Sequence, residues 1–460
     1  MRWRLLLVVL LWVGCGHGSS GGPPGDGGKE DAGGAPPDAG LPLASLRASC
    51  AFGRGDLATK TLADWMPDGG IPIDHVVLVM LENRSFDHYF SSLTVPGQTV
   101  DGAAAGADNP DPAHPGQMVS RFHQTDPCFD GVNNGWDVAH ISVDDGGMDG
   151  FARGNATPDD PSGRSSMGYY DESDLPYFYA LARAFAISDR NFCSVQGPTY
   201  PNRLFYMTGT SYGITDDSLP PQTDGAGHLL PNLFTQLDHA GVSWSVYAQD
   251  IPTPYLLGST SADSAHFFPF SQFAVDAAAG TLPSVSLVEA SVTRGVLNTD
   301  GEPPADFQFS QRWLSDVVAT LMASPAWPSS ALFLTFDEGG GLYDHVPPPP
   351  ACVPDAYPPL IPQGGVPGTF DHLGIRVPLV VVSPYAKRHY VSHVVTDHTS
   401  LLRFVEARFG LPAFTRRDAN AVPPFDLFDF VHPDTSVPSL PDAGVNEDAA
   451  NSCVKEHPGN

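Results

Sequence analysis

An apolar segment that stops abruptly at polar side chains constrains this chain more than any other feature. Val76 to Leu81 is apolar and rich in valine, without polar alternation, and Glu82 and Asn83 follow it directly. An unbroken apolar run of this length is typical of a strand buried on both faces of a parallel sheet. Ligands of open α/β sheets bind at the carboxyl ends of such strands. The two polar residues are therefore predicted to lie at a functional edge.

A second segment repeats this pattern about two hundred and fifty residues later in the chain. Ala331 to Phe336 is again apolar throughout, and it ends at Asp337 and Glu338 before a glycine-rich loop. Two buried strands that end in oxygen-bearing side chains are predicted to place them on the same sheet edge. Four such side chains suit a hard divalent cation, and oxygen ligands do not choose among Ca²⁺, Mg²⁺ and Mn²⁺.

The remaining periodicity alternates between helices and strands, which predicts an α/β fold with a mostly parallel central sheet. Residues 91–174 are instead dominated by Gly, Asp, Pro, Asn and Ser, and we interpret them as a loop-rich cap over the sheet edge. The pattern predicts helices over 175–182, 202–207, 233–240, 309–322 and 401–409, and strands over 184–187, 242–247, 285–288 and 377–382.

The charge of the chain limits its partners. The 460 residues carry a formal net charge of −29, which argues against nucleic-acid binding and offers no basic patch for an anionic membrane. A negatively charged substrate would have to be attracted locally, most simply by a bound cation.

Both ends of the chain are predicted to lie outside the folded domain. Residues 1–15 resemble a bacterial lipoprotein signal, with Cys15 as the lipidated residue and ordinary cleavage as the alternative, so the protein is expected to be exported. Residues 16–57 are interpreted as a disordered tether, because the segment that follows Cys15 is rich in Gly, Pro, Asp and Ser. Residues 433–460 are interpreted as an extended or disordered acidic tail.

Five cysteines remain once Cys15 is set aside, and their spacing matches no zinc pattern. In an exported protein one or two disulfides are expected, and the sequence leaves their pairing open.

Thr199 stands between glycine and proline residues that prevent regular structure and a helical pattern that begins at Asn202. A hydroxyl just before a helix N-terminus lies where unpaired N–H groups and the helix dipole stabilise negative charge. The position suits chemistry on phosphate, although a lone threonine can equally be a turn or capping residue.

Five segments together resemble a known family. ENRSFDHYF, GPTYPNR, FDEGGGLYDHVPPP, IRVPLVVVSPYAK and DHTSLLRF occur in this order and are similar to the bacterial phosphoesterase family of phosphatidylcholine-type phospholipases C and acid phosphatases. The resemblance implies an alkaline-phosphatase-like α/β/α sandwich, with the phosphoesterase domain over residues 71–432.

The resemblance also implies roles for particular residues. Glu82, Asn83, Asp337 and Glu338 match the positions that hold a divalent metal, and Thr199 matches a metal-bound nucleophile. A hydroxyl is a poor nucleophile, and coordination to a cation lowers the cost of deprotonating it. The implied reaction is attack on a phosphate mono- or diester through a phospho-threonine intermediate.

The chain departs from its relatives where they carry histidines. Asn134 stands where they usually have a His before a Trp, and Glu302 stands nearest the place of a His before a Pro; a carboxylate there fits phosphate only when protonated or as part of a changed metal site. Asn134, His140 and Asn202 are predicted to contact substrate. His345 is predicted as the proton donor, with His140 and His266 as alternatives.

Three functions follow from these observations. The first is an exported, metal-dependent, phospholipase C-like phosphoesterase acting on a phosphoester or phospholipid, attached to the bacterial cell envelope through Cys15 or otherwise secreted. The second is a broad-specificity acid phosphatase. The third is a non-catalytic surface lipoprotein that keeps the fold and binds phosphorylated or lipid ligands.

Overall fold

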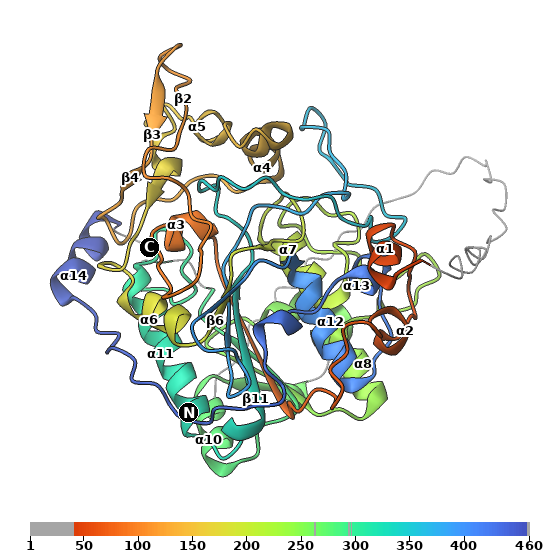
Figure 1. Ribbon diagram of the computed structural model, residues 1–460. Coiled ribbons are helices and arrows are strands. Elements are labelled where there is room, and N and C mark those ends of the chain that lie inside the picture. The colour runs from red at the N-terminus through yellow and green to blue at the C-terminus, as the bar shows by residue number, and fades with distance from the viewer. Residues whose placement is uncertain (1–40, 262–263, 293–294, 296, 458–460) are drawn as a thin grey trace, which may run out of the picture. The chain divides into compact units, whose positions relative to one another are not determined.

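The computed structural model describes residues 41–261, 264–292, 295 and 297–457 (Figure 1). Within this part of the chain, eight strands form one central sheet. In spatial order they are β13 (Tyr390–Ser392), β6 (Ala186–Ser188), β12 (Leu379–Val382), β11 (Ser330–Phe336), β1 (His75–Leu81), β10 (Val285–Glu289), β8 (Trp244–Ala248) and β9 (Phe267–Pro269).

All strands of the sheet run in the same direction except β12, which pairs antiparallel with both of its neighbours, β11 and β6. Parallel neighbours need a crossover, usually a helix, and no α-helix lies between β11 and β12 in the described chain. The chain therefore returns antiparallel at this point. The predicted fold class, α/β with a mostly parallel sheet, is confirmed.

Helices cover both faces of the sheet (Figure 1). One layer contains α6 (Pro176–Ala184), α10 (Ser271–Ala279) and α11 (Phe307–Ala323); the other contains α7 (Thr199–Thr208), α8 (Leu233–Ala240) and α12 (His398–Phe409). Strand β11 packs against both layers, because the ring centroid of Phe333 lies 4.8 Å from that of Phe404 on α12, and Phe336 lies 6.2 Å from Phe178 on α6.

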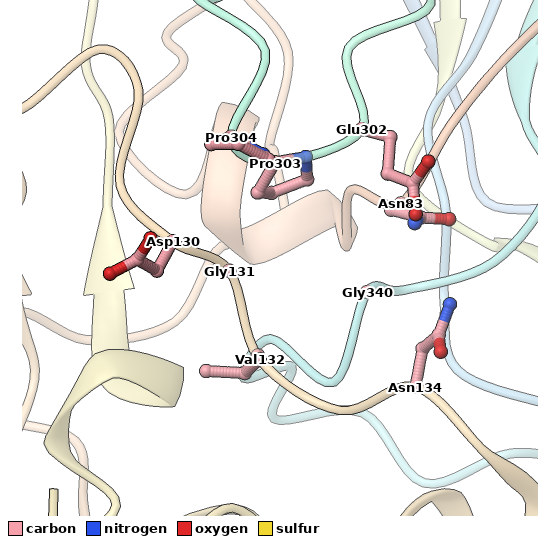
Figure 2. Close-up of a pocket in the computed structure, with 9 residues that line it drawn as sticks. All are labelled: Asn83, Asp130, Gly131, Val132, Asn134, Glu302, Pro303, Pro304 and Gly340. Atoms are coloured by element: carbon pink, nitrogen blue, oxygen red, sulfur yellow. The ribbon is translucent and has the colours of Figure 1, made fainter. Parts of the chain in front are cut away.

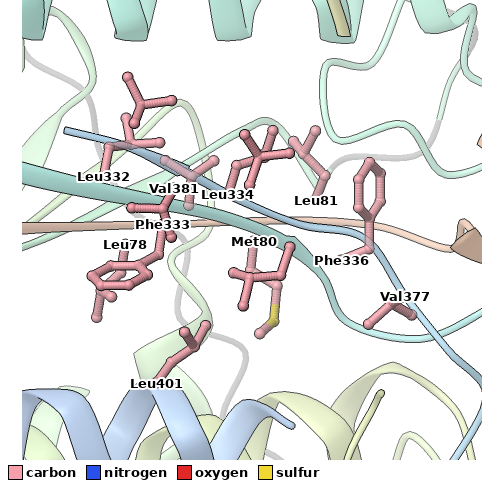
Figure 3. Close-up of a cluster of buried hydrophobic side chains, with 14 of the residues drawn as sticks. Leu78, Met80, Leu81, Leu332, Phe333, Leu334, Phe336, Val377, Val381 and Leu401 are labelled. Atoms are coloured by element: carbon pink, nitrogen blue, oxygen red, sulfur yellow. The ribbon is translucent and has the colours of Figure 1, made fainter. Parts of the chain in front are cut away.

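The core sits between these layers and is built by the two apolar segments that the sequence singles out. Side chains of β1, β11 and β12 interdigitate there with Leu401 of α12 (Figure 3). Every residue of β11 is buried, as is every residue of β1 after His75. Burial on both faces explains why neither segment shows polar alternation.

The segment 91–174 contains short elements separated by loops. They are β2 (Asp108–Pro110), β3 (Met118–Ser120), β4 (Phe122–His123), α4 (Trp136–Val143), α5 (Phe151–Gly154) and β5 (Gly168–Tyr169). Other short elements are α2 (Ala58–Thr61), α3 (Phe86–Phe90), β7 (Asn191–Phe192), α9 (Gly258–Ser261), β14 (Thr396–Asp397) and α13 (Arg416–Asn420).

The predicted tether over 16–57 is wrong for its described part, residues 41–57. Residues 43–48 form helix α1 (Leu43–Ala48), and Leu46 and Phe52 are buried against Ala413 and Ala419. A disulfide joins Cys50 to Cys352. The composition around Gly16 to Leu41 does not extend to this segment, which contributes apolar side chains to a small core. The predicted signal at 1–15, its Cys15 and residues 16–40 lie outside the described residues.

The predicted disordered tail over 433–460 is also wrong in part. Residues 447–456 form helix α14 (Glu447–Glu456), capped by the side chain of Asn446. A second disulfide joins Cys453 to Cys128, and both of these residues are buried. A covalent link to the segment over 91–174 holds residues whose own composition would not order them. The described chain has no helix long and apolar enough to cross a membrane.

Candidate active site

The four oxygen-bearing residues predicted at the sheet edge do meet there. Strands β1 and β11 are parallel neighbours, and their register pairs Leu81 with Phe336. The residues that follow each strand therefore emerge side by side, and the backbone N–H of Asn83 donates to Asp337 Oδ1 at 3.1 Å. The two pairs are joined directly at the carboxyl edge of the sheet.

The loop after β11 reaches this edge because of its glycines. Gly340 has φ +67° and Gly341 has φ +68°. A Cβ atom at Gly340 would lie 2.3 Å from the carbonyl oxygen of Asn83, and one at Gly341 would lie 2.1 Å from the carbonyl oxygen of Asn133. Only glycine permits both the left-handed backbone and these close approaches. The two glycines therefore let the loop after β11 contact both the residue Asn83 after β1 and Asn133 of the segment over 91–174.

The carboxylates at the edge are held by hydrogen bonds. Asp337 Oδ1 accepts the backbone N–H of Glu338 at 2.7 Å, and Glu338 Oε2 accepts that of Gly340 at 2.7 Å. The side chain of Asn134 donates to Glu338 Oε1 at 2.9 Å. Asn134, predicted to contact substrate, therefore lies next to a candidate metal ligand.

The amide of Asn83 completes this group. It faces Asp337 Oδ1 and Glu338 Oε1, and with its nitrogen directed to them it donates to both oxygens, 3.3 Å from Asp337. With the opposite orientation the amide oxygen would face two carboxylates. That orientation provides three converging oxygens, an arrangement that a hard cation stabilises.

Arg203 of α7 is the main cation at this edge. Its Nη2 lies 2.8 Å from Glu82 Oε1, its Nε lies 3.4 Å from Asp337 Oδ2, and its Nη1 lies 3.6 Å from Glu289 Oε1. Burial lowers the pKa of Arg203, but the three carboxylates outweigh burial and raise it above its ordinary value. The guanidinium therefore stays charged and links α7 to the ends of β1, β11 and β10.

The buried carboxylates remain under strong electrostatic stress. Burial raises the pKa of Glu82 well above its ordinary value, the charge of Asp300 raises it further, and Arg203 lowers it. Burial, followed by the charge of Asp337, likewise raises the pKa of Glu338. An all-oxygen donor set with this surplus of negative charge fits a divalent cation held by Glu82, Asn83, Asp337 and Glu338.

Thr199 is the first residue of α7, and Pro198 precedes the helix in an extended conformation. Thr199 is half-buried. It lies four residues before Arg203, and residues at this spacing share one face of a helix. Arg203 contacts Glu82 and Asp337, so it ties α7, the helix that begins at Thr199, to the edge that carries the carboxylates.

Asn202 bonds the backbone of the loop that leads into α7. It is fully buried, its Oδ1 accepts the N–H of Val195 at 3.0 Å, and its Nδ2 donates to the carbonyls of Gly197 at 2.9 Å and Pro198 at 3.1 Å. The predicted substrate contact of Asn202 stays a prediction, because these bonds to the loop backbone do not test it. A side chain with these bonds positions the turn that leads into Thr199.

The histidines predicted as proton donors lie in other surroundings. His345 Nδ1 lies 2.6 Å from Asp87 Oδ2, and its Nε2 lies 3.2 Å from Asp101 Oδ1. Arg376 and Asp344 complete this second buried charge cluster. Closeness in sequence to Asp337 does not bring His345 to the candidate metal ligands, because the loop after the glycines turns it toward α3.

The two alternative histidines are also placed elsewhere. His140 Nδ1 bonds the carbonyl of Trp136 at 2.8 Å, and its ring lies 4.2 Å from that of Trp136, beside a different cavity of about 740 Å³. His266 stacks on Trp244, which begins β8 and so lies at the opposite end of the sheet from the carboxylates. The structure brings neither one to the acidic edge.

A cavity of about 300 Å³ opens beside the acidic edge (Figure 2). Asn83, which follows β1, lies near Glu302 of the loop before α11, and Asn134 of the segment over 91–174 lies across from them, with Pro303 and Pro304 beside the cavity. Its lining consists of Asn83, Asp130, Gly131, Val132, Asn134, Glu302, Pro303, Pro304 and Gly340.

Sequence reasoning missed Arg203, Glu289 and Asp300. Arg203 ends the GPTYPNR segment, and its spacing from Thr199 is the signal that could have identified it. Glu289 ends strand β10, the parallel neighbour of β1, so it follows the same rule of polar residues at strand ends.

The fold and the edge define a mixed α/β enzyme with a buried, acidic site at the carboxyl ends of its central strands. The chain belongs to the Phosphoesterase family, whose model matches residues 73–412. Family membership confirms the predicted resemblance and the predicted enzyme class, a hydrolase of phosphoester bonds.

Individual relatives agree with this assignment. The chain is 32% identical over 373 residues to non-specific phospholipase C1 of Arabidopsis thaliana, covering 76% of this chain and 69% of that protein. It is 31% identical over 437 residues to phospholipase C B of Mycobacterium tuberculosis, covering 81% of each. Among solved structures, a phosphonate monoester hydrolase of Agrobacterium radiobacter is 11% identical, with a TM-score of 0.32 and 74% of each chain covered.

Proposed function

We propose that this protein is an exported, metal-dependent phosphoesterase of the phospholipase C type, which hydrolyses phosphate mono- or diesters through Thr199. The observation that carries the proposal is the junction of Glu82, Asn83, Asp337 and Glu338 at one sheet edge, linked through Arg203 to the helix that begins at Thr199. The names of the relatives, phospholipases C, support the choice of substrate class.

The proposed roles follow from position. Glu82, Asn83, Asp337 and Glu338 would hold a divalent cation, Ca²⁺, Mg²⁺ or Mn²⁺, which supplies Lewis-acid stabilisation of negative charge on oxygen. The Thr199 oxygen would bond to phosphorus as the bond from phosphorus to the leaving alcohol breaks, and water would then hydrolyse the phospho-threonine. Asn134 would donate a hydrogen bond to the phosphoryl group from the cavity wall.

A pair of substrates and a pair of variants test this function. Purified protein is assayed with p-nitrophenyl phosphate and p-nitrophenyl phosphorylcholine, with and without EDTA, alongside Thr199→Ala and Thr199→Ser. We expect EDTA to abolish hydrolysis, Thr199→Ala to lower kcat by at least about 10³-fold, and Thr199→Ser to keep part of the activity because it keeps a hydroxyl.

Other results of this assay would support a different function or a different nucleophile. Activity that survives in Thr199→Ala contradicts the nucleophile assignment. Preference for the monoester at acidic pH supports a broad-specificity acid phosphatase, and no hydrolysis with any divalent metal supports a ligand-binding lipoprotein.

We also propose that the protein is exported and held at the cell envelope by a lipid on Cys15. The two disulfides support an oxidising compartment, where such bonds persist. Cys15→Ala is expected to move the protein from the membrane fraction to the soluble fraction after cell lysis. An unchanged distribution would contradict the anchor.

A further inference from the structure

A second acidic group adjoins the first. Glu82, Asp300 and Glu302 each place a carboxylate oxygen within 4.8 Å of the other two. Glu82 and Asp300 are buried, while Glu302 is half-buried and lines the 300 Å³ cavity (Figure 2). Glu82 follows β1, and the other two residues belong to the loop between β10 and α11.

The loop that carries this group is fixed against β1. The backbone N–H of Glu82 donates to the carbonyl of Asp300 at 2.8 Å, and Arg84 Nη2 donates to the carbonyl of Gly301 at 2.5 Å. The N–H of Glu302 donates to Asp300 Oδ1 at 2.9 Å. These bonds hold the three carboxylates together without any contribution from a ligand, so the group is preorganised.

One oxygen in this group lacks a partner. Asp300 is fully buried, and its Oδ2 has no hydrogen-bond partner in the described chain. A buried carboxylate oxygen left without a donor or a counter-charge is strongly destabilising.

The nearby guanidinium of Arg203 has its ion pairs with Glu82 and with two carboxylates outside this group. Arg203 directs its Nη2 to Glu82 Oε1, and its other nitrogens contact Asp337 and Glu289. Three carboxylates with oxygens within 4.8 Å of one another, one of which is buried and has an unpaired oxygen, form a set that suits a hard cation.

We propose that Glu82, Asp300 and Glu302 form a second divalent-cation site, which shares Glu82 with the site at Asn83, Asp337 and Glu338 and borders the substrate cavity. This inference rests on the proposed function in one respect, because Glu82 is also a ligand of the first metal site proposed there. Glu302 adds a hard oxygen ligand on the side of the cavity. In enzymes with two adjacent metals, the ions lie about 3.5–4 Å apart.

Manganese binding tests the second site directly and without catalysis. The full chain is titrated with Mn²⁺ by isothermal titration calorimetry, and bound Mn²⁺ is examined by electron paramagnetic resonance. We expect two bound ions per chain and the spectrum of an exchange-coupled pair. Glu302→Gln is expected to lower the affinity of one site by about tenfold or more and to leave a single, uncoupled ion.

Asp130→Asn is the matched control. Asp130 lines the same cavity and loses the same charge, but its side chain is 91% exposed and lies outside the cluster. It should keep two coupled ions. One ion per chain in the unmodified protein, or equal affinities in the unmodified protein and Glu302→Gln, would overturn the proposal.

Two further measurements test the second site if Glu302→Gln is uninformative, and separate it from the proposed function. If Glu302→Gln does not fold, the spectrum of the unmodified chain decides, since uncoupled Mn²⁺ overturns the shared ligand and a coupled pair supports it. Hydrolysis by Thr199→Ala is assayed separately. Activity that survives in this variant contradicts the nucleophile assignment of the proposed function, whereas the number of bound ions in the unmodified chain and in Glu302→Gln decides the second site.

Discussion

Arg203 Nη2 lies 2.8 Å from Glu82 Oε1, and this ion pair ties the helix that begins at Thr199 to the end of the central strand β1. Both side chains are almost fully buried. The pair therefore has two effects: it fixes the position of α7 against the sheet, and it neutralises part of the acidic edge when no metal is bound.

Removal of this guanidinium should destabilise the metal-free protein. Arg203→Met leaves buried carboxylates without their counter-charge, and we expect a loss of about 3–5 kcal/mol in the free energy of unfolding, measured by urea denaturation in EDTA. Arg312→Met is the control, because Arg312 pairs with Asp316 on the exposed surface of α11 and should cost less than about 1 kcal/mol. Equal losses in the two variants would contradict the proposed role of Arg203.

Asn202 should affect catalysis through the position of Thr199. Asn202→Ala removes the bonds to Val195, Gly197 and Pro198, so we expect a loss of about 1–3 kcal/mol in stability together with a large fall in kcat. Asn109→Ala provides the comparison, since Asn109 is equally buried and bonds the carbonyl of Met148. Similar kcat values in the two variants would show that Asn202 has only a general structural role.

The pair between His345 and Asp87 should make stability depend on pH. Burial lowers the pKa of His345, but the hydrogen bond and charge of Asp87 outweigh burial and raise it above the ordinary value of 6.5. The contribution of the protonated ring to stability is therefore fully present below pH 6.5 and is lost as the pH rises through the pKa of the folded state.

His345→Gln should remove this dependence. The difference in unfolding free energy between the unmodified protein and the variant is expected to be largest at acidic pH and to shrink at alkaline pH. Urea denaturation across this range measures it, with His372→Gln on the exposed surface as control. A difference in unfolding free energy that grows as the pH rises would contradict the stabilising role of protonated His345.

The disulfide between Cys128 and Cys453 should hold the C-terminal helix in place. The double variant Cys128→Ser with Cys453→Ser is expected to lose about 2–5 kcal/mol of stability and to expose α14 to limited proteolysis. The double variant Cys50→Ser with Cys352→Ser should leave α14 protected, because that disulfide anchors the opposite end of the chain. Equal cleavage of α14 in the two double variants would contradict the prediction that only the disulfide between Cys128 and Cys453 holds this helix.

Much of the sheet was predictable because its central strands are buried on both faces. The apolar runs that form β1 and β11 show their burial directly in composition, and helix α8 was predicted with its observed bounds, Leu233–Ala240. The direction of β12 was not predictable. Its valines are equally apolar in either direction, and only the absence of a crossover helix reverses it.

The candidate site was predictable to the extent that it follows from strand ends. Residues directly after parallel strands share an edge by geometry, which brought Glu82 and Asn83 to Asp337 and Glu338. Proximity in sequence was a poor guide elsewhere, because a loop can turn a residue such as His345 into a different cluster within a few positions.

By itself, the sequence determined that this chain forms a mostly parallel α/β sheet with a phosphoesterase's acidic edge, because buried strands and the residues that end them are encoded locally. Tertiary structure alone decided that Arg203 links the helix that begins at Thr199 to that edge, that Asn202 supports the turn, and that Asp300 and Glu302 adjoin Glu82. These relationships depend on which distant segments pack together, and free energy of burial, rather than any local pattern, makes that choice.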